Sequence, residues 1–350
     1  MITRSAYVKS PGYFEVRDTP VTAPEAGHLL IQIAACGVCG TDLHIADRGA
    51  SDWQPFGHEI SGIVRVVGSG VTRFAAGDRV ALDSSAPCGQ CDVCLPRPYG
   101  RARPDLCTRP LSFWGKGAMG FSQMMLTPQE CAVHLPASVP LDVACLVEPV
   151  GVSIDLTQTA QVGIGDHVLI LGPGPLGLAA ITAAARAGAE KIFVAGRSSS
   201  LARMAAAKAL GADVLIETDK TPLSSYDFGE RRPDKVLVTS PPSTLPEAIG
   251  VPSYGGVVAY IGIAMGPDAA IQLDVDHFHF RKLSLRASHA SPATHALESL
   301  RLLETVPEFG RELISHRFGL EDIASAMETA KSDRKTVKKM VMVNPEIADS

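Results

Sequence analysis

The amino-acid sequence predicts an α/β protein with two domains, one barrel-like and rich in strands, the other a doubly wound parallel sheet. Three observations lead to this prediction. Short strand-like runs broken by proline and glycine fill the N-terminal third, a glycine-rich turn separates a strand from a helix at residues 172–177, and strands alternate with helices after that turn. A length of 350 residues suits about two domains, and a hydrophobic fraction of 46% is ample for two cores.

The N-terminal third holds five strand-like runs, which predict an antiparallel, barrel-like domain: Ser5–Lys9, Phe14–Asp18, His28–Ala35, Ile60–Val67 and Asp78–Leu82. Loops between these runs carry Cys39, Thr41, Asp42 and His44 in "CGVCGTDLH", and then His58 and Glu59 in "GHE". A thiolate, an imidazole and a carboxylate gathered from separate loops form the donor set of a zinc site. The alternative for His58 is that it only caps a loop, and we expect Cys36 to be a buried packing residue.

A second group of cysteines follows the spacing C-x2-C-x2-C-x12-C, at Cys88, Cys91, Cys94 and Cys107. Four thiolates close a tetrahedral shell without leaving a position for water, so this group predicts a structural zinc. The long interval "RPYGRARP" before Cys107 leaves open that this last ligand, and the metal with it, is lost. A nucleic-acid-binding zinc ribbon is disfavoured, because Arg97, Arg101 and Arg103 share one short loop of a chain with a formal charge of −5 and a pI near 6.1.

The segment after this group returns to strand-like sequence in which Phe113, Trp114 and Met119 either line a substrate cleft or fill the core. Residues 141–161 then read as a helix that bends at Pro149 and joins the two domains.

The glycine turn lies between a predicted strand at His167–Leu171 and a predicted helix at Leu176–Ala187, and Lys191–Ala195 resumes as a strand. Gly172, Gly174 and Gly177 match G-x-G-x-x-G, and Pro175 and Leu176 complete the motif. The first glycine permits a tight turn, the second lets a pyrophosphate approach the backbone, and the third lets helix and strand pack closely. The motif predicts a dinucleotide held at the start of the helix, with a purely structural turn as the alternative.

The residue that selects the dinucleotide is expected at the end of the second strand, where an Asp or Glu would bind the adenosine ribose hydroxyls. That position is Gly196, followed by Arg197 and Ser198, with Arg203 one turn further on. Because a cation and hydroxyls would hold a 2′-phosphate, NADP is favoured over NAD. The alternative is that Arg197 stacks on adenine and Ser198 caps the next helix.

Four more strands are predicted beyond Arg197, at Val214–Ile216, Lys235–Thr239, Val257–Ile261 and Leu283–Arg286. They bring the doubly wound sheet to six strands. A helix is expected to start near Thr244. His277 and His279 alternate with Phe278 and Phe280, which predicts an extended segment facing solvent or another subunit, with metal ligation as the alternative. Ala296–Glu304 and Leu320–Ala330 read as helices, and "TVKKMVMV" reads as a final strand.

Together, these motifs resemble the zinc-containing medium-chain alcohol dehydrogenases, in the branch of sorbitol and threonine dehydrogenases. "GVCGTDLH", "GHEISGIVRVVGSGVTRFAAGDRV", the four-cysteine group, "LVEPVGVS" and "VLILGPGPLG" occur in the family's order. The resemblance implies a GroES-like β-barrel catalytic domain at residues 1–154 and 290–350, and a Rossmann domain at 155–289. It implies Cys39, His58 and Glu148 as ligands of the catalytic zinc, with Glu59 as an acidic neighbour that binds or exchanges at the metal.

By the same resemblance, Thr41 and His44 pass the proton of the alcohol to solvent by way of the cofactor ribose. The alternatives are a Thr41 side chain bonded to its own loop and a His44 on the surface. A zinc with an open position lowers the pKa of a bound alcohol, and nicotinamide accepts a hydride. We therefore expect a zinc-dependent NAD(P) oxidoreductase that interconverts a secondary alcohol of polyol, sugar or amino-alcohol type and a ketone.

Two other functions stay open at this stage: a zinc-free quinone or enone reductase of the same fold, and a zinc- and dinucleotide-binding sensor without turnover. A zinc hydrolase is a weaker alternative, because it would leave the dinucleotide motif unexplained. The partners expected are the small-molecule substrate and further copies of the chain in a homodimer or homotetramer, with no nucleic acid and no membrane. The N-terminus lacks the apolar core of a signal peptide, so a cytoplasmic location is expected.

Overall fold

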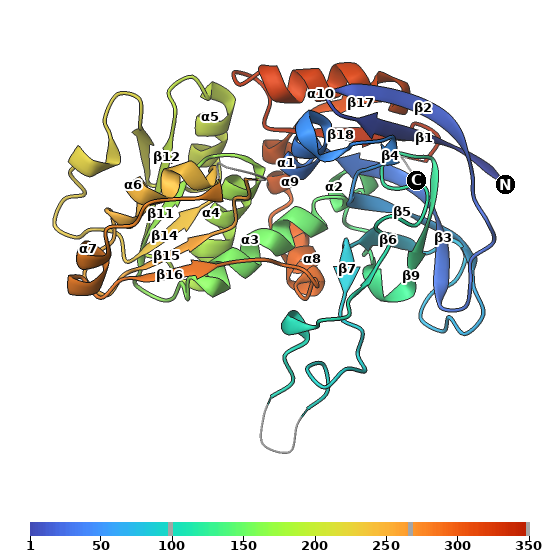
Figure 1. Ribbon diagram of the computed structural model, residues 1–350, viewed down its shortest axis with the longest axis horizontal. Helices are drawn as coiled ribbons and strands as arrows, with labels where there is room; N and C mark the ends of the chain where they lie inside the picture. The colour runs from blue at the N-terminus through green and yellow to red at the C-terminus, as the bar shows by residue number, and fades with distance from the viewer. Residues whose placement is uncertain (97–100, 265–268, 348–350) are drawn as a thin grey trace. The chain divides into compact units, whose positions relative to one another are not determined.

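A computed structural model describes residues 1–96, 101–264 and 269–347 of the chain (Figure 1). Arg97 lies outside these residues. The chain packs as two compact units. The first comprises Met1–Gly151, Ala290–Asp333 and Lys339–Ser350, and the second comprises Val152–His289 and Arg334–Lys338. For comparison, the borders expected from the sequence are 154/155 and 289/290.

The first unit is built on mostly antiparallel sheets, and this agrees with the predicted GroES-like barrel. Among the described residues it has one sheet of order β2-β1-β4, a seven-stranded sheet of order β10-β6-β5-β3-β18-β17 with β9 also paired to β3, and the pair β7-β8. Only β17 and β18 run parallel among these described pairs. The strands are β1 (Ile2–Lys9), β2 (Tyr13–Pro20), β3 (His28–Gly37), β4 (Gln54–Pro55), β5 (Glu59–Val67), β6 (Arg79–Leu82), β7 (Ser85–Ala86), β8 (Leu111–Ser112), β9 (Met124–Pro128), β10 (Ala132–His134), β17 (Ile314–Phe318) and β18 (Lys339–Val343).

The helices of the first unit are α1 (Gly40–His44), α2 (Leu141–Ala144), the start of α3 (Val147–Thr159), α8 (Ala296–Thr305), α9 (Glu308–Leu313) and α10 (Ile323–Ser332). The prediction of one helix over 141–161 is wrong, because the helix breaks at Cys145 and Leu146. After this break, Pro149 is the third residue of α3. In the first turn of a helix the backbone N–H groups have no acceptor within the helix, so a proline there costs no helical hydrogen bond.

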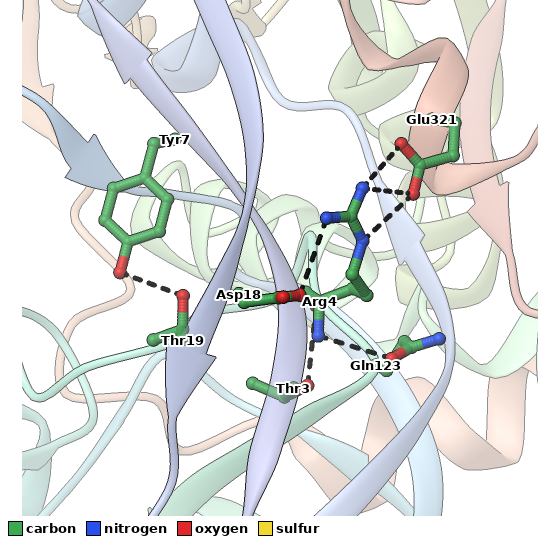
Figure 2. A network of polar contacts seen from close by, with 7 residues as sticks. All are labelled: Thr3, Arg4, Tyr7, Asp18, Thr19, Gln123 and Glu321. Atoms are coloured by element: carbon green, nitrogen blue, oxygen red, sulfur yellow. Dashed lines mark hydrogen bonds and ion pairs between the residues drawn. The ribbon is translucent and has the colours of Figure 1, made fainter.

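A polar network joins β1 to the segment that precedes α10 within the first unit (Figure 2). The Arg4 guanidinium on β1 donates to both carboxylate oxygens of Glu321, each at 3.0 Å, and also reaches Asp18 on β2 at 3.5 Å. The backbone N–H of Arg4 donates to the Gln123 side chain at 3.3 Å. Glu321 belongs to the short turn of helix at Leu320–Asp322 that precedes α10. The network therefore holds the first strand beside the last helix.

The second unit contains one parallel sheet of order β13-β12-β11-β14-β15-β16 within the described residues. Its strands are β11 (His167–Leu171), β12 (Lys191–Gly196), β13 (Val214–Glu217), β14 (Lys235–Val238), β15 (Val257–Tyr260) and β16 (Ser284–Ala287), and its helices are the end of α3, α4 (Pro175–Ala187), α5 (Leu201–Ala209), α6 (Leu245–Ile249) and α7 (Val275–Phe280). Within this sheet the first strand in sequence, β11, lies in the middle. The next two strands extend outward to β13, and the chain then returns to form β14 on the other side of β11. The predicted doubly wound sheet is confirmed, and its order reverses between β11 and β14, where such sheets bind ligands.

The strands of this sheet are buried because they are almost uninterrupted apolar runs. Val168, Leu169 and Ile170 on β11 are fully buried, and Val236–Val238 on β14 are too. Helix α4 packs against β11, β12 and β14, and α5 packs against β12 and β13. The glycine turn between β11 and α4 is thereby held rigidly between the sheet and a helix.

The predicted extended segment at His277 and His279 is wrong, because these residues lie on α7. The Asp274 carboxylate accepts the backbone N–H of His277 at 3.0 Å and so caps the start of this helix. The cap overrides the alternation of His and Phe on which the strand prediction was based. None of the helices in the described residues combines the length and hydropathy that a membrane crossing requires.

Candidate functional site

Three predicted metal ligands converge in the first unit. The ligand atoms of Cys39, His58 and Glu59 all lie within 4.8 Å of one another. Cys39 caps the start of α1 just after β3, while His58 precedes β5 and Glu59 is its first residue. Because β3 and β5 are neighbours with Gly37 opposite Glu59, the two loop ends meet. A Cβ on Gly37 would stand 2.1 Å from Glu59 Oε2, so only glycine leaves room for this carboxylate.

Asp42 orients the cluster, a role that sequence analysis did not assign to it. Its side chain is fully buried, and Oδ2 accepts the backbone N–H of Cys39 at 2.9 Å. Oδ1 lies 3.6 Å from His58 Nδ1, which is an ion pair when the ring is protonated. Burial lowers the pKa of His58, but Cys39 and Asp42 raise it by more, so the pKa lies well above its usual value. The cluster therefore holds a surplus of negative groups that suits a divalent cation.

A buried lysine lies on the other side of Glu59. Lys339 on β18 forms an ion pair with Glu59 Oε2 and donates to the Val38 carbonyl at 2.9 Å. Both charged side chains are almost fully buried, at 1% and 2% exposure. Lys339 therefore balances the negative charge of Glu59, which lies among the prospective metal ligands. Nothing in the local sequence around Lys339 indicates this role.

Glu148, the predicted third zinc ligand, does not belong to the group within 4.8 Å, yet it lies in the same electrostatic environment. Burial raises the pKa of Glu148 to about 8, with His58 lowering it and Glu59 and Asp83 raising it further. Asp83 is a buried acid that sequence analysis missed. It follows β6, and burial raises its pKa to about 7 against a smaller opposing effect of His295. Carboxyl groups of raised pKa near a metal cluster are typical of a catalytic cavity.

Thr41 and His44 lie three residues apart on α1, so they share one face of this helix, and both are half-buried. Trp114 is 39% exposed, and its ring lies 5.1 Å from that of His58, whereas Phe113 and Met119 are buried core residues. Of the three, only Trp114 is thus available to a substrate. Cys36 is fully buried, as the packing role requires.

The four cysteines of the second group come together between β7 and β8. Their sulfur atoms lie within 4.8 Å of one another, with Cys88–Cys94 at 4.0 Å, Cys91–Cys107 at 3.8 Å and Cys107–Cys88 at 3.5 Å. A tetrahedral zinc with bonds of about 2.3 Å separates its sulfur ligands by roughly 3.8 Å. Backbone N–H groups, that of Cys94 first, lower the pKa of Cys91 to about 6, whereas burial raises the pKa of Cys94 to about 12. The group fits a zinc with four sulfur ligands, Cys107 included.

The glycine turn of the second unit fits a pyrophosphate. Gly172 has φ of +107°, and Gly174 caps α4, whose first residues are Pro175 and Leu176. No described atom lies within 4 Å of a Cβ built on Gly174, so the backbone is open on that side. A Cβ on Gly177 would stand 1.9 Å from the Gly172 carbonyl oxygen, so the helix can pack this closely only with glycine there. Each glycine meets the requirement of the predicted motif.

The predicted cofactor-binding residues beyond β12 differ in exposure and in contacts within the protein. Arg197 is exposed, but the Arg203 guanidinium donates to the Val337 carbonyl at 2.9 Å. The backbone N–H and the hydroxyl of Ser198 donate to Asp219 at 2.7 and 2.6 Å. Arg197 is therefore the predicted donor that is most open to a 2′-phosphate.

Comparisons with known proteins agree with this architecture. The model of the alcohol dehydrogenase GroES-like domain matches residues 25–137, and that of the zinc-binding dehydrogenase domain matches residues 175–304. The chain is 30% identical to the sorbitol dehydrogenase of Bacillus subtilis (strain 168) over 346 residues, which cover 95% of this chain and 94% of that protein. The chain belongs to the zinc-containing medium-chain alcohol dehydrogenase family. As a zinc-containing alcohol dehydrogenase it is an oxidoreductase that uses zinc and a nicotinamide dinucleotide.

Other relatives of this alcohol dehydrogenase support the same conclusion. The L-idonate 5-dehydrogenase of Vitis vinifera is 30% identical, over 92% of this chain and 90% of the relative. The crystal structure of a short chain alcohol dehydrogenase of E. coli CFT073, complexed with NADH, is 25% identical. It superimposes with a TM-score of 0.87 over 98% of this chain and 99% of that one.

Proposed function

We propose that this enzyme oxidises a secondary alcohol of polyol, sugar or amino-alcohol type to a ketone, or reduces the ketone, with zinc bound by Cys39, His58 and Glu148. The observation that carries the proposal is the convergence of Cys39, His58 and Glu59 within 4.8 Å, with half-buried Glu148 electrostatically linked to His58 and Glu59. The substrate class is supported by relatives named sorbitol, D-altritol 5-, L-idonate 5- and L-threonine 3-dehydrogenase. In all four names the substrate carries a secondary alcohol.

Zinc with an open position supplies acidity to a bound alcohol, and nicotinamide exchanges the hydride. The protein's own part is to bind, to orient and to move a proton. Asp42 Oδ1 lies 3.6 Å from His58 Nδ1, Lys339 balances the charge of Glu59, and the Trp114 ring lies 5.1 Å from that of His58. Thr41 and His44, on one face of α1, would carry the proton from the alcohol to solvent. Cys88, Cys91, Cys94 and Cys107 would hold a second zinc that only stabilises the fold.

Of the two dinucleotides, we propose NADP as the favoured one, because exposed Arg197 follows Gly196 where NAD enzymes carry an acid. The glycines at 172, 174 and 177, with Pro175 and Leu176, would hold the pyrophosphate at the start of α4. The cytoplasmic location and the homodimer or homotetramer stay predictions from the sequence.

The test is absorbance of the reduced nicotinamide, recorded with a panel of polyols, sugars and amino alcohols, with NAD and NADP separately, before and after chelation. Chelator-sensitive reduction of a cofactor is the expected result. Chelator-insensitive reduction of quinones or enones would instead indicate a zinc-free reductase.

Two matched variants separate the two metal groups. Cys39→Ser should remove most turnover and leave the fold intact, and Cys91→Ser should mainly lower stability and bound zinc. Equal and mild effects of both variants on turnover and on unfolding would contradict this assignment of the metals.

A further inference from the structure

The end of β12 has no room for the acid that usually binds the adenosine ribose. Gly196 is buried at this position, and a Cβ built on it would lie 2.6 Å from Pro173 Cγ and 3.0 Å from Met204 Sδ. Pro173 belongs to the glycine turn itself and cannot move without changing that turn. An Asp or Glu at residue 196 is therefore sterically excluded, and any carboxylate near the ribose has to come from another strand.

A carboxylate, that of Asp219, reaches the end of β12 from the neighbouring strand β13. β12 and β13 are parallel, with Gly196 opposite Glu217, and the Thr218 N–H donates to the Gly196 carbonyl at 2.9 Å. This pairing carries Asp219 to Ser198, where Oδ1 accepts the backbone N–H at 2.7 Å and Oδ2 accepts the hydroxyl at 2.6 Å. These two bonds hold the pKa of Asp219 below its usual value, so the exposed carboxylate is charged at neutral pH.

We propose that Asp219 is a specificity-determining residue of the dinucleotide site, which accepts the ribose hydroxyls of NAD and opposes the attraction of Arg197 for the 2′-phosphate of NADP. The inference rests on the proposed dinucleotide function. A carboxylate offers about four acceptor positions, of which Ser198 occupies two, so the others can accept ribose hydroxyls. A 2′-phosphate would meet a like charge there, and both Ser198 donors already bond to Asp219.

Arg197 and Asp219 therefore have opposite effects on the affinity for a 2′-phosphate at the end of β12. The Arg203 guanidinium donates to the Val337 carbonyl at 2.9 Å, so we assign the attraction for a 2′-phosphate to Arg197. Arg197 and Asp219 are both exposed, so salt screens their effects. At this exposure, removing one unit charge near a phosphate should change relative affinity about fivefold to tenfold.

The test measures NADH and NADPH binding to the purified full chain by nicotinamide fluorescence, without substrate, in wild type and Asp219→Asn. The ratio of the NADPH to the NADH dissociation constant should fall about fivefold to tenfold in the variant, and less at high salt. Arg197→Ala should raise that ratio. Asp227→Asn is the matched control, since this exposed carboxylate also accepts a backbone N–H, that of Gly229 at 2.9 Å, and its loss should leave the ratio unchanged.

A ratio within twofold of wild type in Asp219→Asn would overturn the proposal and leave Asp219 as a turn anchor. If this variant does not fold, Asp219→Ser keeps a hydrogen-bonding oxygen without the charge, and the same ratio decides. Failure of the wild-type protein to bind either nucleotide would refute the proposed function as well as this inference. Binding with an unchanged ratio would refute this inference alone.

Discussion

Replacing Lys339 with Met should destabilise the first unit more than any exposed ion-pair variant. The substitution keeps most of the apolar stem and removes the ammonium group that pairs with Glu59. It leaves a carboxylate at 2% exposure without its counter-charge, and it leaves the Val38 carbonyl without its donor. Both losses raise the free energy of the folded state, whereas water solvates these groups in the unfolded chain.

The expected loss follows from burial. Removing one partner of a fully buried ion pair costs about 3–5 kcal/mol, while an exposed pair contributes about 1 kcal/mol or less. We therefore expect the free energy of unfolding of the metal-free protein to fall by about 3–5 kcal/mol in Lys339→Met. The loss should be smaller with zinc, since a cation beside Glu59 replaces part of the missing charge. Glu59→Gln combined with Lys339→Met should recover most of the loss, because no buried charge is then left unpaired.

The assay is urea unfolding followed by tryptophan fluorescence. Both tryptophans of the chain, Trp53 and Trp114, belong to the first unit, so the signal reports that unit alone. The control is Lys331→Met, which removes the exposed pair with Asp47 in the same unit. A loss below about 1 kcal/mol for Lys339→Met without metal, or a double variant as unstable as the sum of the single ones, would refute the reasoning.

Two further predictions concern Gly177 and Asp83. Gly177→Ala places a Cβ 1.9 Å from the Gly172 carbonyl oxygen and should weaken NADH binding more than tenfold and lower the melting temperature; wild-type binding would show that the turn can widen freely. For Asp83, burial raises the pKa from 3.8 to about 7, so between these values the folded protein holds more protons than the unfolded chain and loses stability as pH rises. Asp83→Asn should remove about 3 kcal/mol of that loss between pH 4.5 and 7.5, measured by urea unfolding at these two pH values. The same pH dependence in the variant would mean that this carboxyl group is solvated.

The features that the sequence predicted well are those decided over short distances along the chain. An apolar run, three glycines and an alanine-rich helix predict the turn at residues 172–177, since its strand, cap and helix are neighbours in the sequence. Three of the four clustered cysteines lie within seven residues, at Cys88, Cys91 and Cys94, so their sulfurs can meet around one ion. Two predictions failed: one helix over 141–161, which breaks at Cys145 and Leu146, and an extended segment at His277, where the Asp274 cap starts a helix.

Only the tertiary structure decided which charges face one another. Lys339 reaches Glu59 because β18 is inserted beside β3, and Asp219 reaches Ser198 because β13 pairs with β12. Gly196 reads in the sequence as a missing acid, but it is also a consequence of how close Pro173 lies to it. Local patterns record propensity and motif spacing, whereas the energy of a buried charge depends on partners that strand order brings from distant parts of the chain.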